Sequence, residues 1–294
     1  MNLHQLETFV HVAEHGSFSK AALVLGVAQP ALSRQVRALE TELHETLLLR
    51  HGRGVQLTDA GRRLFEHCQD ILHLVSRARD DVLARRNEPT GNVTIAMPPT
   101  LARLHTLPLI RAFQAEMPRA RLAVMEGFSA HLTEWLLTGR TDIALIYTPE
   151  PLPALDIAPL RRERLCLASP AGQAPAKALT LQQLAPYPLV MPQRGHIFRN
   201  LMESAAAMAG VQLNVAWEVS SVPVILDLVA AGIAHAALSE EAIRSYEHPE
   251  RVATTSFADA GIFNTLCLVT PAQKRTTPLM LRSAALLRRL ITGA

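Results

Sequence analysis

Hydrophobic and polar positions in residues 30–43 repeat with the period of an amphipathic helix. One stripe is apolar, with steps of four, three and four residues along Leu32, Val36, Leu39 and Leu43. A second face carries small and cationic groups at Pro30, Ser33, Arg34 and Arg37. A helix of this kind fits the major groove of DNA, where Arg binds guanine edges or phosphates and Ser binds phosphate. The pattern therefore predicts a DNA-reading helix.

The residues before this helix carry the signals of two shorter helices. A first apolar stripe, predicted to end near Gly16, comprises Leu3, Leu6, Phe9, Val10 and Ala13. Ser19 is expected to cap the next helix with Phe18 as its hydrophobic staple, and Gly26 to end it in the left-handed conformation. Pro30 then suits the first turn of the DNA-reading helix. Any small helical bundle could show such caps, but their combination with the polar face favours a helix-turn-helix.

Two short apolar runs, residues 47–50 and 55–57, follow this helix and surround a turn that contains Arg50 and Arg53. This pattern predicts a β-hairpin wing whose guanidinium groups reach backbone phosphates or the minor groove. The alternative is that both arginines are ordinary solvated turn residues.

A long helix is predicted to begin at Thr58 and Asp59, an N-cap followed by an acid in the first turn. Its apolar positions alternate steps of four and three residues and form a heptad seam at Leu64, Cys68, Ile71, Val75, Ala78 and Val82. Such a seam favours a dimerisation helix, and packing against its own domain is the alternative. Residues 87–91 then form a linker, because Pro89 and Gly91 disfavour helix.

The pattern after residue 91 changes to alternating strands and helices. Strands are predicted at residues 93–97, 122–126, 142–147, 165–169, 215–219, 236–239 and 266–270. Helices are predicted at residues 101–117, 132–138, 181–184, 198–209, 222–231 and 278–291. The alternation indicates an α/β fold with an open, largely parallel sheet and ligands at the carboxyl ends of its strands.

Polar and aromatic residues stand at these strand ends and helix starts. The candidate ligand-binding residues are Pro99, Thr100, Phe128, Ser129, Tyr147, Thr148, His196, Phe198, Ser221 and Val222. Helix N-termini and hydroxyls favour an anion, so a small organic acid with an aromatic or apolar body is the expected ligand. The alternative is that the hydroxyls only cap helices, and Arg199 can pair with Glu203 on its own helix instead of with a ligand.

Composition adds limits to this interpretation. With 294 residues the chain has room for two or three domains. Residues 1–90 contain eleven Lys or Arg and eleven Asp or Glu, so net charge alone does not indicate nucleic acid. No apolar run is long enough for a membrane span and no signal peptide is recognisable, so a cytoplasmic location is expected. The three distant Cys residues lack metal spacing, so no metal or other cofactor is expected.

The motifs of common enzymes are missing from the sequence. There is no Gly-x-Ser-x-Gly elbow, glycine-rich phosphate loop, His-Glu-x-x-His or paired Cys motif, so the chain is not expected to be an enzyme. His105, His131 and His235 are interpreted as ordinary histidines. Cys166 and Cys267 are expected to pack as small hydrophobes.

Residues 1–65 resemble the amino-terminal domain of LysR-type transcriptional regulators. The matching residues are Phe9, Gly16, Ser17, Ser19, Ala21, Ala22, Leu25, Gln29, Pro30, Ala31, Ser33, Leu39, Glu40, Leu43, Leu48, Arg50, Leu57, Thr58 and Gly61. By this resemblance five residues would lie at the DNA groove: Gln29, Pro30, Ser33, Arg34 and Arg37. Arg50, Arg53 and Thr58 would lie nearby. Some members of the family sense oxidants through two reactive Cys in the second lobe, a role not expected here.

The resemblance also implies an organisation for the whole chain. Residues 1–58 would form a winged helix-turn-helix DNA-binding domain and residues 59–90 a dimerisation helix and hinge. Residues 91–294 would form a two-lobed effector-binding domain like a periplasmic solute-binding protein. Lobe I would hold residues 91–161 and 267–294, and lobe II residues 162–266. Two strands near residues 161–165 and 264–268 would cross between the lobes, and Cys166 and Cys267, which both lie near them, could be neighbours.

The function implied is a DNA-binding transcriptional regulator modulated by a small effector between the lobes. Its expected partners are double-stranded DNA with an interrupted palindrome, a small organic acid, further copies of itself as a dimer and tetramer, and RNA polymerase. Two rivals stay open from the residues alone. A ligand-independent DNA-binding repressor would leave the cleft unused, and a free solute-binding protein would leave the DNA-reading helix unexplained.

Overall fold

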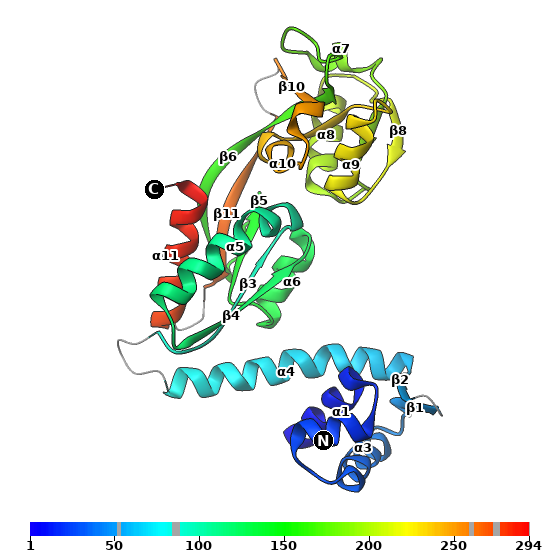
Figure 1. The fold of residues 1–294 in the computed structure, drawn as a ribbon, viewed down its shortest axis with the longest axis vertical. Helices are drawn as coiled ribbons and strands as arrows, with labels where there is room; N and C mark the ends of the chain where they lie inside the picture. The colour runs from blue at the N-terminus through cyan, green and yellow to red at the C-terminus, as the bar shows by residue number, and fades with distance from the viewer. Residues whose placement is uncertain (52–53, 84–88, 259–261, 273–276, 294) are drawn as a thin grey trace. The chain divides into compact units, whose positions relative to one another are not determined.

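The computed structural model describes residues 1–51, 54–83, 89–258, 262–272 and 277–293. These fall into two compact units, an amino-terminal unit with helices α1 to α4 and a carboxy-terminal unit from strand β3 to helix α11 (Figure 1). Within the described ranges no helix combines the length and the apolar character that a membrane crossing requires.

The amino-terminal unit is a helical domain with a small hairpin. Its elements are α1 (Leu3–His15), α2 (Phe18–Leu25), α3 (Gln29–Leu43), β1 (Leu48–His51), β2 (Gly54–Leu57) and α4 (Asp59–Leu83). The buried residues of the predicted stripes form one core that includes Leu6, Phe9, Leu32, Val36 and Leu39. The predicted order of helices and wing is therefore confirmed.

The caps of the first helices agree with the prediction at two of three positions. Gly16 and Gly26 end α1 and α2 with φ of 58° and 66°. The expected cap at Ser19 is wrong, because Ser17 holds the extended conformation and its hydroxyl accepts from the Lys20 amide. Phe18 is consequently the first residue of α2. The apolar stripe of α3 fades at its last residue, Leu43, whose exposure is 36%.

Close backbone contacts fix the wing on the helices. The Glu40 carboxylate accepts from the amides of Leu47 and Leu48, at 2.9 and 3.2 Å. A side chain at Gly54 would come within 2.6 Å of the Gly16 carbonyl oxygen, and one at Gly61 within 2.1 Å of the Leu47 carbonyl oxygen. Glycine is required at both positions because the opposing atoms are backbone.

The heptad seam of α4 is packed against its own unit in its first half and exposed in its second half. Thr58 caps the helix as predicted, with its hydroxyl 2.9 Å from the Gly61 amide. The first seam residues, Leu64, Cys68 and Ile71, pack on the core of their own unit. Beyond them Val75 is 40% exposed and Ala78 is exposed too. The side chain of Val82 lies outside the described residues. Own-domain packing thus explains the first half of the seam and leaves the second half uncovered.

The carboxy-terminal unit has two lobes joined by two long strands. Lobe I contains β3 (Gly91–Met97), α5 (Pro99–Glu116), β4 (Ala120–Glu126), α6 (Ser129–Thr138), β5 (Ile143–Tyr147) and α11 (Pro278–Thr292). Lobe II contains α7 (Leu181–Leu184), β7 (Leu189–Met191), α8 (Ile197–Met208), β8 (Val215–Glu218), α9 (Val222–Ala230), β9 (Ala236–Ser239), α10 (Glu240–Arg244), a 3₁₀ turn (Pro249–Arg251) and β10 (Val252–Ser256). β6 (Leu155–Pro170) and β11 (Phe263–Pro271) run side by side through both (Figure 1).

These crossing strands determine the sheet topology. The order is β10-β6-β11-β5-β3-β4, and β9 also pairs with β6. The predicted crossing of two strands is confirmed, since residues 161–164 pair with residues 263–266. The expectation of a largely parallel sheet is wrong. Among the described strands, β3 pairs in parallel with β4 and β5, and β7 with β8, whereas every pairing of β6 and β11 is antiparallel. A strand that leaves a lobe and one that returns run in opposite directions, so their pairing is antiparallel.

Candidate DNA-binding surface and ligand cavity

The polar face of α3 is open to solvent while its apolar face is buried. Gln29, Pro30, Arg34 and Arg37 are exposed and Ser33 is half-buried. Among the described residues no carboxylate lies within ion-pair distance of either arginine. Both guanidinium groups therefore keep all their donors for an external partner, and two such groups one helical turn apart match base edges or phosphates.

Arg50 of the wing is held against the helices. Its Nη1 donates to Ser33 Oγ at 3.2 Å, and its guanidinium lies over the Phe18 ring, 4.5 Å from the centroid. Wing, α2 and α3 are thereby fixed relative to one another at the exposed face. Arg53, the second predicted wing arginine, lies outside the described residues.

Thr58, which the resemblance places near the DNA, makes hydrogen bonds inside the amino-terminal unit. Its hydroxyl donates to the Thr46 carbonyl at 2.7 Å and accepts from the Gly61 amide. The hydroxyl proton is thus engaged inside the unit, at the start of α4 and next to the wing.

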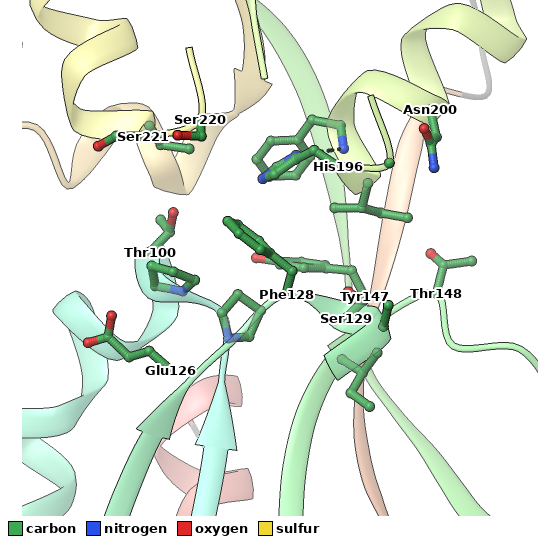
Figure 2. A pocket seen from close by; sticks show the side chains of 18 of the residues that line it. Thr100, Glu126, Phe128, Ser129, Tyr147, Thr148, His196, Asn200, Ser220 and Ser221 are labelled. Carbon is green, nitrogen blue, oxygen red and sulfur yellow. Dashed lines mark hydrogen bonds between the residues drawn. The ribbon is translucent and has the colours of Figure 1, made fainter. Parts of the chain in front are cut away.

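A cavity of about 790 Å³ lies between the two lobes of the carboxy-terminal unit. All the predicted ligand-binding residues line it: Pro99, Thr100, Phe128, Ser129, Tyr147, Thr148, His196, Phe198, Ser221 and Val222. Figure 2 shows Thr100, Phe128 and Tyr147 from lobe I opposite His196, Ser220 and Ser221 from lobe II. The sequence prediction missed other lining residues, including Arg103, Glu126, Glu150, Asn200 and Tyr246. Arg103 and Asn200 follow helix starts by a few residues, Glu126 is the last residue of β4, and Glu150 and Tyr246 lie outside the helices and strands.

Four helices begin at this cavity. They are α5, α6, α8 and α9. α8 is capped by His196, whose Nδ1 accepts from the Phe198 amide at 3.2 Å. In the described structure α5 and α9 have prolines in the first turn and no side-chain cap. Their remaining first-turn N–H groups are suited to an acceptor from outside the chain.

Aromatic rings form a wall that includes both lobes. The Phe128 and His196 centroids are 5.6 Å apart in an edge contact, and those of Tyr147 and Phe198 are 5.9 Å apart. Burial lowers the pKa of His196 to about 4, so the ring is neutral at pH 7. Because Nδ1 accepts a hydrogen bond, Nε2 carries the ring proton. The wall is thus apolar with one neutral donor.

Thr148 marks a strained point at the end of β5. Its φ is 42°, although it is β-branched and precedes Pro149, which disfavours helical conformations for it. Two hydrogen bonds with Thr265 of β11 hold it there: the Thr148 amide donates at 2.7 Å, and its Oγ1 accepts from the Thr265 amide at 3.1 Å. The cavity wall is therefore tied directly to a crossing strand.

Several charged or reactive residues are engaged away from the cavity. Arg199 is buried and donates to Glu203 at 2.5 Å, to Glu218 and to the Pro192 carbonyl, which fits the own-helix alternative. His235 shares a hydrogen bond of 2.9 Å with Ser169. Neither residue lines the cavity.

The suggestion that Cys166 and Cys267 are neighbours is wrong. Cys267 stands opposite Pro159 on β6, seven residues from Cys166 and so about 23 Å away along the strand. The two belong to separate cores of lobe II and lobe I. Burial raises the pKa of Cys166 to about 11 and also raises the pKa of Cys267, so neither thiolate forms readily.

Comparison with known proteins agrees with both halves of this geometry. Residues 3–62 match the model of the bacterial regulatory helix-turn-helix protein, lysR family, and residues 86–291 match the LysR substrate binding domain. The nitrogen assimilation regulatory protein nac of Escherichia coli (strain K12) is 34% identical over 83% of this chain and 80% of its own length. The HTH-type transcriptional regulator BbuR of Bordetella bronchiseptica is 30% identical over 90% of this chain and 82% of its own length.

A solved structure gives the same result for the fold. Full-length CbnR in complex with its target DNA superimposes with a TM-score of 0.74 at 25% identity, covering 99% of this chain and 100% of that one. These relatives are regulators and not enzymes. The chain therefore belongs to the LysR family of DNA-binding transcriptional regulators, with the effector-binding domain that this family carries.

Proposed function

We propose that this regulator reads DNA with α3 and the wing, and that a small organic carboxylate in the cavity between the lobes modulates its activity. The observation that supports the effector most directly is the convergence of four helix starts from both lobes on one cavity. A ligand there contacts both lobes at once, so it binds one lobe arrangement better than others and shifts the population toward it.

The DNA contacts divide into two kinds. Gln29, Pro30, Ser33, Arg34 and Arg37 form the proposed base-reading face, because they occupy the exposed side of α3. Arg50 and Arg53 contact the phosphate backbone and position the helix. Thr58 stays a capping residue in this proposal.

A dimer supplies two such surfaces for an interrupted palindrome. The exposed second half of α4, with Leu74, Val75 and Ala78, is the proposed dimer seam. Leu74 is 54% exposed, which is unfavourable unless a second helix covers it. Two dimers assemble into a tetramer on the promoter, where RNA polymerase is the further partner. The proposed compartment is the cytoplasm, where the chromosome is found.

The proposed effector has a carboxylate and an apolar or aromatic body. Its carboxylate accepts from first-turn N–H groups near Thr100 and Ser221, where the positive ends of α5 and α9 favour negative charge. Its body packs on Phe128 and Phe198. Arg103 also lines the cavity, and its guanidinium pairs with Glu247 at 2.6 Å.

Thermal unfolding of the full chain tests the effector class. Aromatic and aliphatic carboxylates are compared with the matched primary amides, which have the same body without the charge. A carboxylate at 100 times its Kd stabilises the folded protein by about 2.7 kcal/mol, and its amide does so much less. Thr100→Val, which removes the hydroxyl and keeps the shape, is the matched variant for the site.

A ligand-independent repressor is the alternative, and it predicts no stabilisation by any acid and DNA binding unaffected by these compounds. A free solute-binding protein does not account for α3, the wing or the regulator relatives.

A further inference from the structure

Contacts between charged and polar side chains join the lobes where α5 approaches α10. Arg103 of α5 lies 2.6 Å from Glu247 of lobe II. His105, on the same helix, has its Nε2 3.4 Å from Glu241 Oε1 of α10. Arg161, on crossing strand β6, pairs with the other oxygen of Glu241. One carboxylate of lobe II is thus shared between a lobe I helix and a crossing strand.

Arg161 is also connected to the cavity through Glu163 and Tyr147. Arg161 Nε donates to Glu163 Oε1 at 2.8 Å, and the hydroxyl of Tyr147 donates to Glu163 Oε2 at 2.9 Å. Tyr147 lines the cavity. Arg161 Nη1 also donates to the Ile291 carbonyl of α11 at 3.1 Å. A continuous chain of polar contacts therefore connects the cavity wall with α10.

The ion pairs of Glu163, Glu241 and Glu247 differ in burial and therefore in strength. Glu163 is 8% exposed, so its charge depends on Arg161 and Tyr147 for compensation. The side chains of Arg103 and Glu247 are 38% and 73% exposed, and such surface pairs contribute little. Glu241 and His105 lie between these limits at 23% and 13%. The lobe arrangement consequently depends on Glu241 more than on Glu247.

We propose that His105, Arg161 and Glu241 form a clasp that sets how far the two lobes open. Opening the lobes separates Glu241 from the Arg161 guanidinium and from the His105 ring, whose pKa is lowered by burial and which is therefore neutral at pH 7. Arg161 then keeps Glu163 and the Ile291 carbonyl. Glu241 does not line the cavity, so it acts on a ligand only by positioning the lobes. The inference rests on the proposed role of the cavity as the effector site, because a ligand that moves Tyr147 disturbs the same chain of contacts.

The chain offers a matched control for this residue. Glu240, the preceding residue of α10, pairs with Arg244 on its own helix and its side chain is 59% exposed. Glu240→Gln and Glu241→Gln therefore make the same chemical change at adjacent positions, and only the second removes the clasp.

The experiment measures the distance between spin labels on the two lobes of the ligand-free, full-length protein. Leu281→Cys on α11 and Met208→Cys on α8 provide label sites that are 58% and 91% exposed. The native Cys residues are buried with raised pKa values, so the new thiols react first. Labelled chains are mixed with excess unlabelled chain so that distances within one chain dominate.

Glu241→Gln is expected to move the distance distribution away from the parent's and to broaden it, with His105→Gln producing a smaller change. Glu240→Gln leaves it unchanged. A Glu241→Gln protein with the parent melting temperature and the parent distribution overturns the proposal. If Glu241→Gln does not fold, His105→Gln is judged by the same criterion. Because no ligand is present, the result is independent of whether carboxylates prove to be effectors.

Discussion

The α3 surface and the lobe cavity are assembled from contacts of different range. On α3 the exposed Arg34 and Arg37 lie within four residues of each other, and the local helix period alone places them on one face. In the cavity Phe128 meets His196 across the lobes, and Arg103 meets Glu247 at a separation of 144 residues. A surface built from one helix can be presented without a partner element, whereas the cavity exists only while two lobes keep their arrangement.

The largest difference between the two regions is expected in the stability lost when a glycine is replaced by alanine. Gly61→Ala places a Cβ against the Leu47 carbonyl, which cannot retreat because the neighbouring amides are held by Glu40. A loss of about 3 kcal/mol in the unfolding free energy of the amino-terminal unit is expected. Gly210→Ala in lobe II meets no described atom within 4 Å and has φ of 66°, so only about 1 kcal/mol is lost. Denaturant unfolding followed by circular dichroism measures both, and equal losses would contradict this account.

The second prediction concerns base reading by α3. Arg34→Ala is expected to reduce the preference for the cognate palindrome by roughly 1–3 kcal/mol, because one base-edge contact is lost. Arg53→Ala is expected to weaken all sequences alike and to lower the salt dependence by about one phosphate contact. Gel shifts with cognate and scrambled duplexes at two salt concentrations separate the two effects.

Arg79→Ala, at an exposed position of α4, is the control for loss of a positive charge outside α3. An Arg34→Ala protein that discriminates as well as the parent would remove this residue from the reading face.

The order of helices, the wing, most strand positions and the cavity residues could be predicted because their signals are local. Gly26 and Thr58 act through residues one turn away, and the cavity residues follow from the rule that helices start at strand ends. The features that could not be predicted depend on residues far away in the sequence. Arg161 finds Glu241 only after the lobes fold, and β7 is too short, at three residues, to show a period. The prediction assigns the cap of α2 to Ser19 instead of Ser17 because both residues carry a hydroxyl suited to an N-cap.

The third prediction concerns how the buried ring of His196 makes the stability of the protein depend on pH. The folded-state pKa of His196 is about 4, below its ordinary value of 6.5, so the unfolded chain binds a proton that the folded chain excludes. Stability is therefore complete above pH 6.5 and is lost as the pH falls toward 4. His196→Asn keeps a capping side chain and does not titrate. Between pH 7 and 4 the parent should lose about 2 kcal/mol relative to this variant, after allowance for partial exposure.

Urea unfolding at a series of pH values gives this difference directly. A constant difference across the range would mean that His196 has the same pKa in the folded and the unfolded chain, which would contradict the exclusion of a charged ring from the cavity wall.

The smallest effect is expected on DNA affinity when Arg50, the wing residue that contacts α2 and α3, is replaced by lysine. Arg50→Lys keeps the positive charge but loses the planar group that lies on Phe18 and donates to Ser33. The salt dependence of binding should stay as in the parent, while the specific affinity falls by about 1 kcal/mol because Ser33 and the wing are less well held. Arg50→Ala should change both quantities. If Arg50→Lys binds the cognate duplex like the parent, Arg50 contributes only its charge. The α3 surface is then even more self-contained than the contacts of Arg50 with Ser33 and Phe18 indicate.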